Sequence, residues 1–399
     1  MYWIYCAIAL QKFEGGDVMK KAWNSQEIKG VNRKVVLEVL HFNSPISRAE
    51  IADITGLTRA TVTNIIKEFE ALGLVEEVGK KSGSYGRRKS LLKFRSGAFL
   101  VMGVVITEEE MQAGIFDIEA NEMGYSSIEI DENDSMDHII EALLKIMNDI
   151  VKTSNVDKDR IFGIGVGVSR FVNAKKNISI LRLKSVLEKR FKIPVWIDNI
   201  ANAAALGEKW YGVGKDYDNF VFVMADRSLQ ASMIIDGEIY RGPFKIAGGV
   251  GYNPSSLNES CPNIESKTSV VLLKKAYETE TGKSLSINEV LDLAQKEDSI
   301  AMKILRELNG NLSHAVVSLV NILCPEAVII GGRGAFIKEI TIEEIEKSFD
   351  KYLYCTQSPS IFIENYLKKM KILGTVAVAI EGIMSLPYSF LFKKNNSIL

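Results

Sequence analysis

Cysteine and histidine are scarce in this chain of 399 residues, which has four cysteines and three histidines. No two cysteines form a CxxC pair, and the chain is far longer than the small secreted domains that depend on disulfides. We therefore expect no disulfide scaffold and a reducing, cytoplasmic location. Low-complexity tracts and short-period repeats are also absent, which excludes a solenoid built from short repeats.

Long apolar runs are missing as well. The first ten residues are apolar, but this run is too short to cross a bilayer and has no basic flank or small-residue cleavage site. The letters EGGDVM at residues 14–19 can be encoded by a purine-rich ribosome-binding tract followed by a start codon. Our hypothesis is that Met19 is the true start and that residues 1–18 are a non-native N-terminal extension.

Net charge is low, at −1, but it is unevenly distributed. Residues 19–95 hold 15 basic and 8 acidic residues, whereas residues 96–399 hold 33 and 40. A basic head on an acidic body favours an anionic polymer as the partner of the head, although an ordinary basic helical domain would look the same by charge. The length predicts two or three domains, and the 47% hydrophobic content is enough for buried cores.

Residues 24–72 show the pattern of a helix-turn-helix. Apolar spacing predicts a helix over 32–42, preceded by a less certain one. The segment from Ser47 to Glu50 is a capping box that opens a second helix, and Gly56 suits the positive φ of the turn that follows. Thr58 then caps a third helix over 59–72.

The third helix has one apolar stripe and one polar face. Its outward residues can hydrogen-bond to base edges or reach phosphates, and its N-terminus offers free N–H groups. Such a helix enters the major groove of double-stranded DNA. The residues that we expect to contact DNA here are Ser47, Arg48, Thr58, Arg59, Ala60, Thr61, Thr63, Asn64 and Lys67.

A basic hairpin follows directly. Two short strands, expected at 74–78 and 90–94, flank the letters GKKSGSYGRRK. Coming after a helix-turn-helix, this segment is typical of a wing, and we expect Arg87, Arg88 and Lys89 to reach an adjacent minor groove. The alternative is a solvated basic loop.

From residue 98 the pattern changes to that of an α/β fold. A meander of strands, a helix, and then alternating strands and helices occur twice, which indicates two related lobes with a cleft between them. The expected strands are 99–106, 111–116, 124–130, 161–168, 194–197, 220–224, 232–235, 327–330 and 360–363, and the expected helices are 135–153, 180–191, 199–211, 266–280, 287–296, 299–323, 340–352 and 373–384.

The motifs occur in the order helix-turn-helix, GRR wing, GIGVGV, IDNIANAAALGEKW, IIDGEIYRG, AGGVGY and VIIGG. This order resembles the ROK family, and within it the xylose- and N-acetylglucosamine-type repressors. The resemblance implies a winged helix-turn-helix domain at 19–95 and an actin-like, ribonuclease-H-like ATPase fold at 96–399. Lobe 1 would comprise about 96–207 plus 373–399, and lobe 2 about 208–372. Some members of the family phosphorylate a sugar with ATP, and the repressors use the sugar as inducer.

The motifs of family kinases are altered in this chain. The catalytic base of the family aligns with Ile200, which cannot accept a proton. The glycine-rich phosphate loop aligns with 226–232 and has lost its glycines, while Asp226 adds repulsion. The N-terminal phosphate loop aligns with 105–109 and is likewise changed, as is the turn at 169–173. The resemblance therefore implies no catalytic residues.

The zinc and sugar sites depart from the family too. Tyr252 stands at the position of the family's histidine, and Cys261 is the one cysteine near it, so we expect no metal and no cofactor. Gly249 replaces a sugar-binding glutamate. Asn199 and Glu265 match effector-binding positions of the family, whereas Asp198 has a structural role there. Either the effector is less polar than a hexose or the cleft no longer senses one.

These observations favour a sequence-specific transcriptional regulator, a repressor of carbohydrate-related genes that binds its operator as a homodimer. The body would supply the dimer interface and an effector site for a sugar or sugar derivative. We expect it to catalyse no reaction and to bind no membrane. Two alternatives stay open: a sugar kinase with a fused DNA-binding head, and a constitutive DNA-binding dimer without effector.

Overall fold

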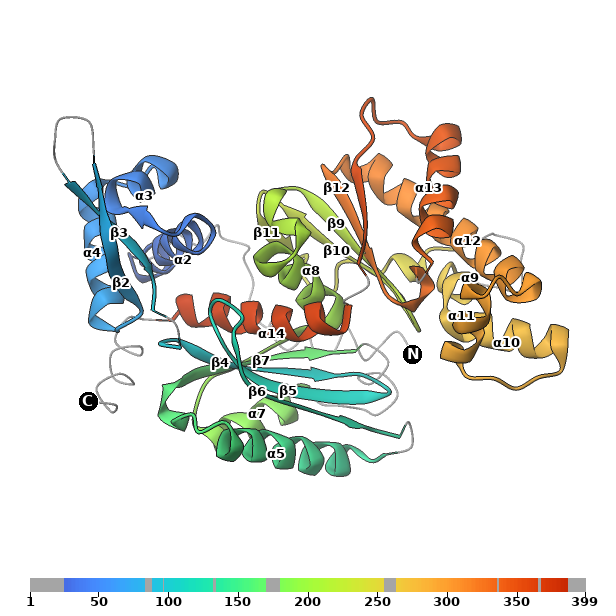
Figure 1. The fold of residues 1–399 in the computed structure, drawn as a ribbon, viewed down its shortest axis with the longest axis horizontal. Coiled ribbons are helices and arrows are strands. Elements are labelled where there is room, and N and C mark those ends of the chain that lie inside the picture. Colours follow the sequence, from blue (N-terminus) through green and yellow to red (C-terminus); the bar gives the residue numbers. More distant parts are fainter. Residues whose placement is uncertain are drawn as a thin grey trace, which may run out of the picture. The chain divides into compact units, whose positions relative to one another are not determined.

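A computed structural model describes residues 25–82, 88–95, 97–131, 134–169, 180–254, 263–335, 337–364 and 367–386. The chain divides into two compact units, whose elements are labelled in Figure 1. The first comprises Met1–Arg95, Arg241–Ala247 and Glu381–Leu399. The second comprises Ser96–Tyr240 and Gly248–Ile380. Residues 1–18, which we interpret as a non-native extension, lie outside the described residues.

The described part of the first unit has three helices and a small sheet. Its elements are α2 (Ser25–Asn43), β1 (Ile46–Ser47), α3 (Arg48–Thr55), α4 (Arg59–Ala71), β2 (Val75–Ser82) and β3 (Arg88–Phe94), and the sheet order is β1-β3-β2. The apolar stripe expected on the third helix is buried: Val62, Ile66 and Phe69 are each 0% exposed. The predicted winged helix-turn-helix is therefore confirmed as the fold of this unit.

Two details of the first unit differ from expectation. The expected helix over 32–42 and the less certain one before it form a single helix, α2, which passes through Gly30 without a break. Strand β1 was missed, because two residues carry no periodicity. Ile46 pairs with Leu92 and Ser47 with Leu91, so the segment entering α3 becomes the edge of the sheet.

The second unit contains two five-stranded sheets with the same plan. In each, three consecutive strands form an antiparallel meander, and two further strands pair parallel beside the first of them. The first sheet has the order β6-β5-β4-β7-β8 and the second the order β11-β10-β9-β12-β13. This repetition confirms the two related α/β lobes predicted from the sequence.

The strands of the first sheet are β4 (Leu100–Ile106), β5 (Glu110–Asp117), β6 (Glu122–Glu129), β7 (Ile161–Val168) and β8 (Val195–Asn199). Those of the second are β9 (Phe220–Ala225), β10 (Leu229–Ile235), β11 (Glu238–Tyr240), β12 (Ala327–Gly331) and β13 (Ser360–Glu364). The helices are α5 (Met136–Thr153), α7 (Ile180–Phe191), α8 (Ile200–Tyr211), α9 (Glu265–Thr268), α10 (Val270–Thr281), α11 (Ile287–Gln295), α12 (Ser299–Leu323), α13 (Lys338–Tyr352) and α14 (Leu367–Met384). We call the first sheet with α5 and α7 lobe 1, and the second sheet with α9 to α13 lobe 2.

Helix α14 packs closely on the first sheet and against α8 (Figure 1). A Cβ atom at Gly165 would lie 1.8 Å from the carbonyl oxygen of Thr375. Where α8 and α14 meet, a Cβ atom at Gly374 would lie 1.5 Å from the carbonyl oxygen of Ala203. Glycine is needed at these two positions because the backbones approach too closely for any side chain.

Several predicted boundaries in the second unit moved. The helix expected at 373–384 begins at Leu367, and the helix expected at 266–280 is divided into α9 and α10 at Ser269. Strand β10 begins at Leu229 rather than at residue 232, because it pairs with β9 up to Ala225. The segment aligned with a phosphate loop is therefore mostly strand, with a tight turn at 226–228.

We expected no disulfide scaffold, but a single disulfide joins Cys324, at the end of α12, to Cys355 beyond α13, with the two Cα atoms 6.3 Å apart. The cysteines are 31 residues apart, a spacing that carries no motif and gave no signal. None of the helices in the described ranges is long and apolar enough to cross a membrane.

Candidate functional site

Helix α4 is capped and presents a polar face to solvent. The Thr58 hydroxyl accepts a hydrogen bond from the Thr61 amide at 3.1 Å and lies 2.9 Å from the Thr61 hydroxyl. This cap satisfies a free amide at the helix start. The Thr63 hydroxyl donates back to the carbonyl of Arg59 at 2.7 Å.

The residues expected to read DNA divide into two groups by exposure. In the first group, Thr58, Arg59, Ala60, Asn64 and Lys67 are exposed, and Thr61 and Thr63 are half-buried. Ala60, Thr63, Asn64 and Lys67 lie opposite the buried stripe of α4, and Thr58, Arg59 and Thr61 lie at its N-terminal end. Together they offer hydroxyl, amide, ammonium and guanidinium groups, which can hydrogen-bond to base edges and phosphates.

Ser47 and Arg48 are held inside the unit instead. Ser47 is 2% exposed, and its hydroxyl donates to Glu50 at 2.7 Å within a complete capping box. Arg48 forms ion pairs with Glu70 and Glu77, which tie α3 to α4 and β2. These two residues therefore position the reading helix, and their side chains are already engaged within the unit.

The wing is partly described. Arg88 and Lys89 lie in β3, opposite Ser82 and Lys81 of β2. Arg87 lies outside the described residues. The paired strands extend further than the strands expected at 74–78 and 90–94, since β2 continues to Ser82 and β3 begins at Arg88.

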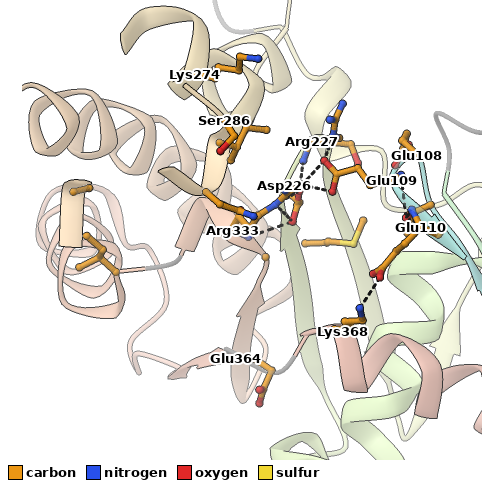
Figure 2. A pocket seen from close by; sticks show the side chains of 18 of the residues that line it. Glu108, Glu109, Glu110, Asp226, Arg227, Lys274, Ser286, Arg333, Glu364 and Lys368 are labelled. Atoms are coloured by element: carbon orange, nitrogen blue, oxygen red, sulfur yellow. Dashed lines mark hydrogen bonds and ion pairs between the residues drawn. The ribbon is translucent and has the colours of Figure 1, made fainter. Parts of the chain in front are cut away.

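A cleft of about 1370 Å³ opens in the second unit between elements of both lobes (Figure 2). It is lined by the β4–β5 turn of lobe 1, by the β9–β10 turn and the end of β12 in lobe 2, and by α14. Its lining is rich in charge of both signs, with ten acidic and six basic residues. An open cleft of this size can hold a small molecule.

The DNIAN segment has become a structural junction. Asn199 caps α8 by accepting the Asn202 amide at 2.7 Å, while Asp198 accepts the Asn202 side-chain amide at 2.8 Å. The Asn202 side chain in turn accepts the Ser232 hydroxyl at 2.8 Å, which links β8 of lobe 1 to β10 of lobe 2. Ile200 lines the cleft and is 1% exposed.

The other expected effector residue is also engaged structurally. Glu265 accepts the Leu229 amide at 3.0 Å, which joins α9 to the start of β10. Asn199 and Glu265 are both absent from the lining of the cleft described above. Tyr252, at the position of the family's histidine, is 56% exposed. In the described ranges no three His, Cys, Asp or Glu side chains are grouped as a metal site, and Cys261 lies outside them.

Four charged side chains meet at the centre of the cleft (Figure 2). Arg333 contacts Asp226 from Nη2 at 2.7 Å and from Nε at 3.1 Å. Glu109 of lobe 1 accepts from Arg227 at 2.8 Å and lies 3.1 Å from Arg333 Nη2. We call Glu109, Asp226, Arg227 and Arg333 the cleft cluster.

The cluster sets the ionisation of its members. Burial opposes the charge of Asp226, but the charge and hydrogen bonds of Arg333 outweigh it and hold the pKa of Asp226 below its ordinary value. Lys371 of α14 also lines the cleft, and burial lowers its pKa in spite of the nearby Asp226 and Glu110. Lys368 pairs with Glu110 at 2.6 Å.

The sequence contains a signal for this cluster. The two segments aligned with phosphate loops carry Glu109 and then Asp226 with Arg227, and Arg333 follows the glycine pair at 331–332. Charges of opposite sign at turns that converge in the fold attract one another and favour ion pairs.

The fold and the site define a protein of two parts. One is a winged helix-turn-helix with a capped, exposed helix, and the other is a two-lobed, actin-like unit with isoleucine at the position of the expected base. The chain belongs to the ROK family, whose profile matches residues 101–381. A Crp-like helix-turn-helix domain profile matches residues 29–84. The family expected from the motifs is thus confirmed.

Similar proteins cover nearly the whole chain. The xylose repressor of Caldicellulosiruptor bescii is 27% identical over 400 residues, which cover 91% of this chain and 99% of that protein. A ROK family transcriptional regulator, a homologue of the E. coli MLC protein, superposes with a TM-score of 0.79 at 19% identity over 93% of this chain and 100% of that one. A Streptomyces griseus ROK glucokinase with bound glucose and AMPPNP superposes with a TM-score of 0.62 at 21% identity, over 71% of this chain and 100% of that one. The last two show the fold.

Proposed function

We propose that this chain is a sequence-specific DNA-binding transcriptional repressor of carbohydrate-related genes. The observation that carries the proposal is the exposed polar face of α4, which is capped by Thr58 and supported by a buried apolar stripe. The excess of basic residues over 19–95 and the similarity to xylose repressors support it. Thr58, Arg59, Ala60, Thr61, Thr63, Asn64 and Lys67 would contact the operator, with Arg87, Arg88 and Lys89 from the wing.

A binding assay with the chain's own promoter region tests this function. We expect the full chain to bind a labelled promoter duplex at physiological salt at least about 10³-fold more tightly than a scrambled duplex. Asn64→Ala should lower this preference by about tenfold or more, whereas Lys275→Ala, an exposed change on α10 in the second unit, should leave it intact. Equal affinity for both duplexes would contradict the proposal.

The second unit would serve as an effector-binding and dimerisation domain without catalysis. Ile200 cannot act as a general base, and Asp226 lies where a phosphate would bring further negative charge. We expect no sugar-dependent ATP turnover above that of a buffer control. Measurable phosphorylation would favour the alternative, a sugar kinase with a fused DNA-binding head.

A thermal-shift screen separates an effector-responsive repressor from a constitutive DNA-binding dimer. A ligand that binds only the folded protein raises its Tm. We expect one member of a panel of sugars and sugar derivatives to raise the Tm and to weaken binding to the promoter duplex. If no member does either, the second unit serves dimerisation alone.

A further inference from the structure

The cleft cluster lies where three turns converge at the ends of central strands. The turn from β4 to β5 carries Glu109, the turn from β9 to β10 carries Asp226 and Arg227, and the residue two beyond the end of β12 is Arg333. Figure 2 shows these four side chains pointing toward one another across the cleft. Lobe 1 contributes one carboxylate, and lobe 2 contributes two guanidinium groups and one carboxylate.

Contacts within lobe 2 alone hold Arg333 in place. Asp226 accepts from the Arg333 side chain and from its backbone amide, the latter at 3.3 Å. Gly332, which precedes it, has φ +111°, and a Cβ atom there would lie 2.2 Å from the carbonyl oxygen of Ala225. The backbone under Arg333 is therefore packed against β9, so the direction of its guanidinium is set within lobe 2.

Lobe 1 holds Glu109 equally firmly. The Thr107 hydroxyl accepts the Glu110 amide at 3.1 Å and closes the turn. The carbonyl of Glu109 accepts the Ile130 amide at 3.0 Å, which ties the turn to the end of β6. Because its backbone is held at these points, the Glu109 carboxylate is presented to lobe 2 from a hydrogen-bonded turn.

The cluster combines charges from both lobes. Lobe 2 contributes the two positive charges of Arg227 and Arg333 and the negative charge of Asp226. Glu109 adds a negative charge from lobe 1 and contacts both guanidinium groups, at 2.8 Å and 3.1 Å. A carboxylate shared by two arginines is a charge-assisted arrangement, moderated here by solvent because Glu109 is 43% exposed.

We propose that Arg227 and Arg333 form a carboxylate-binding site on lobe 2, and that Glu109 of lobe 1 is its built-in ligand. The two lobes are thereby held together without a bound nucleotide. An external anion can enter this part of the cleft only by displacing Glu109, and Asp226 opposes any large phosphate chain. The site takes small carboxylates when Glu109 is removed.

Chemical rescue of Glu109→Ala tests the site. We expect this variant of the full chain to melt about 1–2 °C below the natural protein, as after the loss of one ordinary interaction in a chain of this size. Amides of the 107–110 and 226–229 turns should exchange with deuterium faster. Sodium acetate should restore the Tm and the slow exchange more than sodium chloride at the same ionic strength.

Three controls separate a binding site from general destabilisation. Acetate should have no such effect on the natural protein, on Glu109→Ala combined with Arg227→Gln, or on Glu122→Ala, which removes an exposed carboxylate at the start of β6. If Glu109→Ala fails to fold, Glu109→Gln keeps the volume and should show the same faster exchange. Rescue by acetate that matches chloride, or unchanged exchange in both variants, would overturn the proposal.

Discussion

Asn64 and Lys67 lie one turn apart on the exposed face of α4 but should act on DNA in different ways. Asparagine can form paired hydrogen bonds with adenine, whereas lysine mainly neutralises phosphates. The structure places both side chains in solvent, opposite Val62, Ile66 and Phe69. Specificity and electrostatic affinity are therefore separable at this helix.

We predict that Lys67→Ala reduces the magnitude of the slope of log K against log salt concentration by about one. It should also weaken binding to all duplexes by a similar factor. Asn64→Ala should leave the salt slope unchanged and lower discrimination at one base pair by about tenfold or more. Fluorescence anisotropy between 50 and 200 mM salt, a range chosen because phosphate contacts change affinity strongly across it, measures both effects. Identical behaviour of the two variants would exclude this division of roles.

Glu208 on α8 is a buried acid that serves no proposed binding role. It is 0% exposed, its Oε2 accepts the Val213 amide at 3.1 Å, and its Oε1 has no hydrogen-bond partner in the described structure. Burial, with the nearby Glu364, raises its pKa to about 7 from the ordinary 4.5. At neutral pH much of this group is therefore protonated in the folded chain.

We predict that Glu208 makes the protein less stable as pH rises. Below its unfolded pKa, both states hold the proton and there is no effect. Between pH 4.5 and about 7 the unfolded state releases its proton first, so stability falls, by about 3 kcal/mol in all. Glu208→Gln should remove this loss. The Tm of Glu208→Gln should exceed that of the natural protein at pH 8 but not at pH 5. The control Glu278→Gln, an exposed change on α10, should have the same Tm as the natural protein at both pH values.

At the level of single residues, the exposure of side chains on α4 followed from the sequence, whereas the partners of Arg48 did not. The reading face of α4 follows from a 100° step along the helix, which depends on local geometry alone. Ser47 and Arg48 were expected to contact DNA, but both side chains have partners within the unit. Ser47 donates to Glu50. Arg48 pairs with Glu70 and Glu77, which lie 22 and 29 residues further along the chain. Such partners are decided by tertiary packing, which periodicity does not encode.

At the level of elements, the crossing of α8 and α14 depends on missing side chains. We predict that Gly374→Ala destabilises the protein by about 3 kcal/mol or more, because its Cβ would overlap the backbone of Ala203. Gly310→Ala is the matched control: it also lies inside a helix, and the nearest atom to its Cβ, of Glu344, is 3.8 Å away. This control should gain about 0.5–1 kcal/mol from helix propensity. Thermal melts of both variants measure the contrast, and equal Tm values would contradict the close crossing.

Element boundaries failed where tertiary contacts override local signals. The first turns of α14 contain Lys368, Lys369 and Lys371, so this stretch lacks the apolar spacing that predicts a helix. Lys368 pairs there with Glu110. The break between α9 and α10 falls at Ser269, whose hydroxyl accepts the Val271 amide and donates to the carbonyl of Arg227. In the first case the partner that stabilises the observed structure comes from strand β5, and in the second from the β9–β10 turn.

At the scale of the whole molecule, the two related α/β lobes followed from the repeated alternation of elements, since meander and crossover connections allow few topologies. The cleft cluster did not follow, because it depends on three turns that meet only in the fold. The chain has thus kept the architecture of a two-lobed binding protein while filling its centre with its own charges.

The last prediction concerns assembly on DNA. One winged helix-turn-helix buries too little surface for high specificity, so two copies of the chain should bind two half-sites whose centres lie about one helical turn apart. We expect native mass spectrometry to find two chains on a duplex with both half-sites. A duplex with one half-site scrambled should bind at least about 10-fold more weakly in anisotropy titrations. Moving the half-sites apart by about five base pairs places them on opposite faces of the helix and should weaken binding similarly, whereas about ten added base pairs should restore part of it. Saturation by a single chain, with no dependence on spacing, would show that one head acts alone.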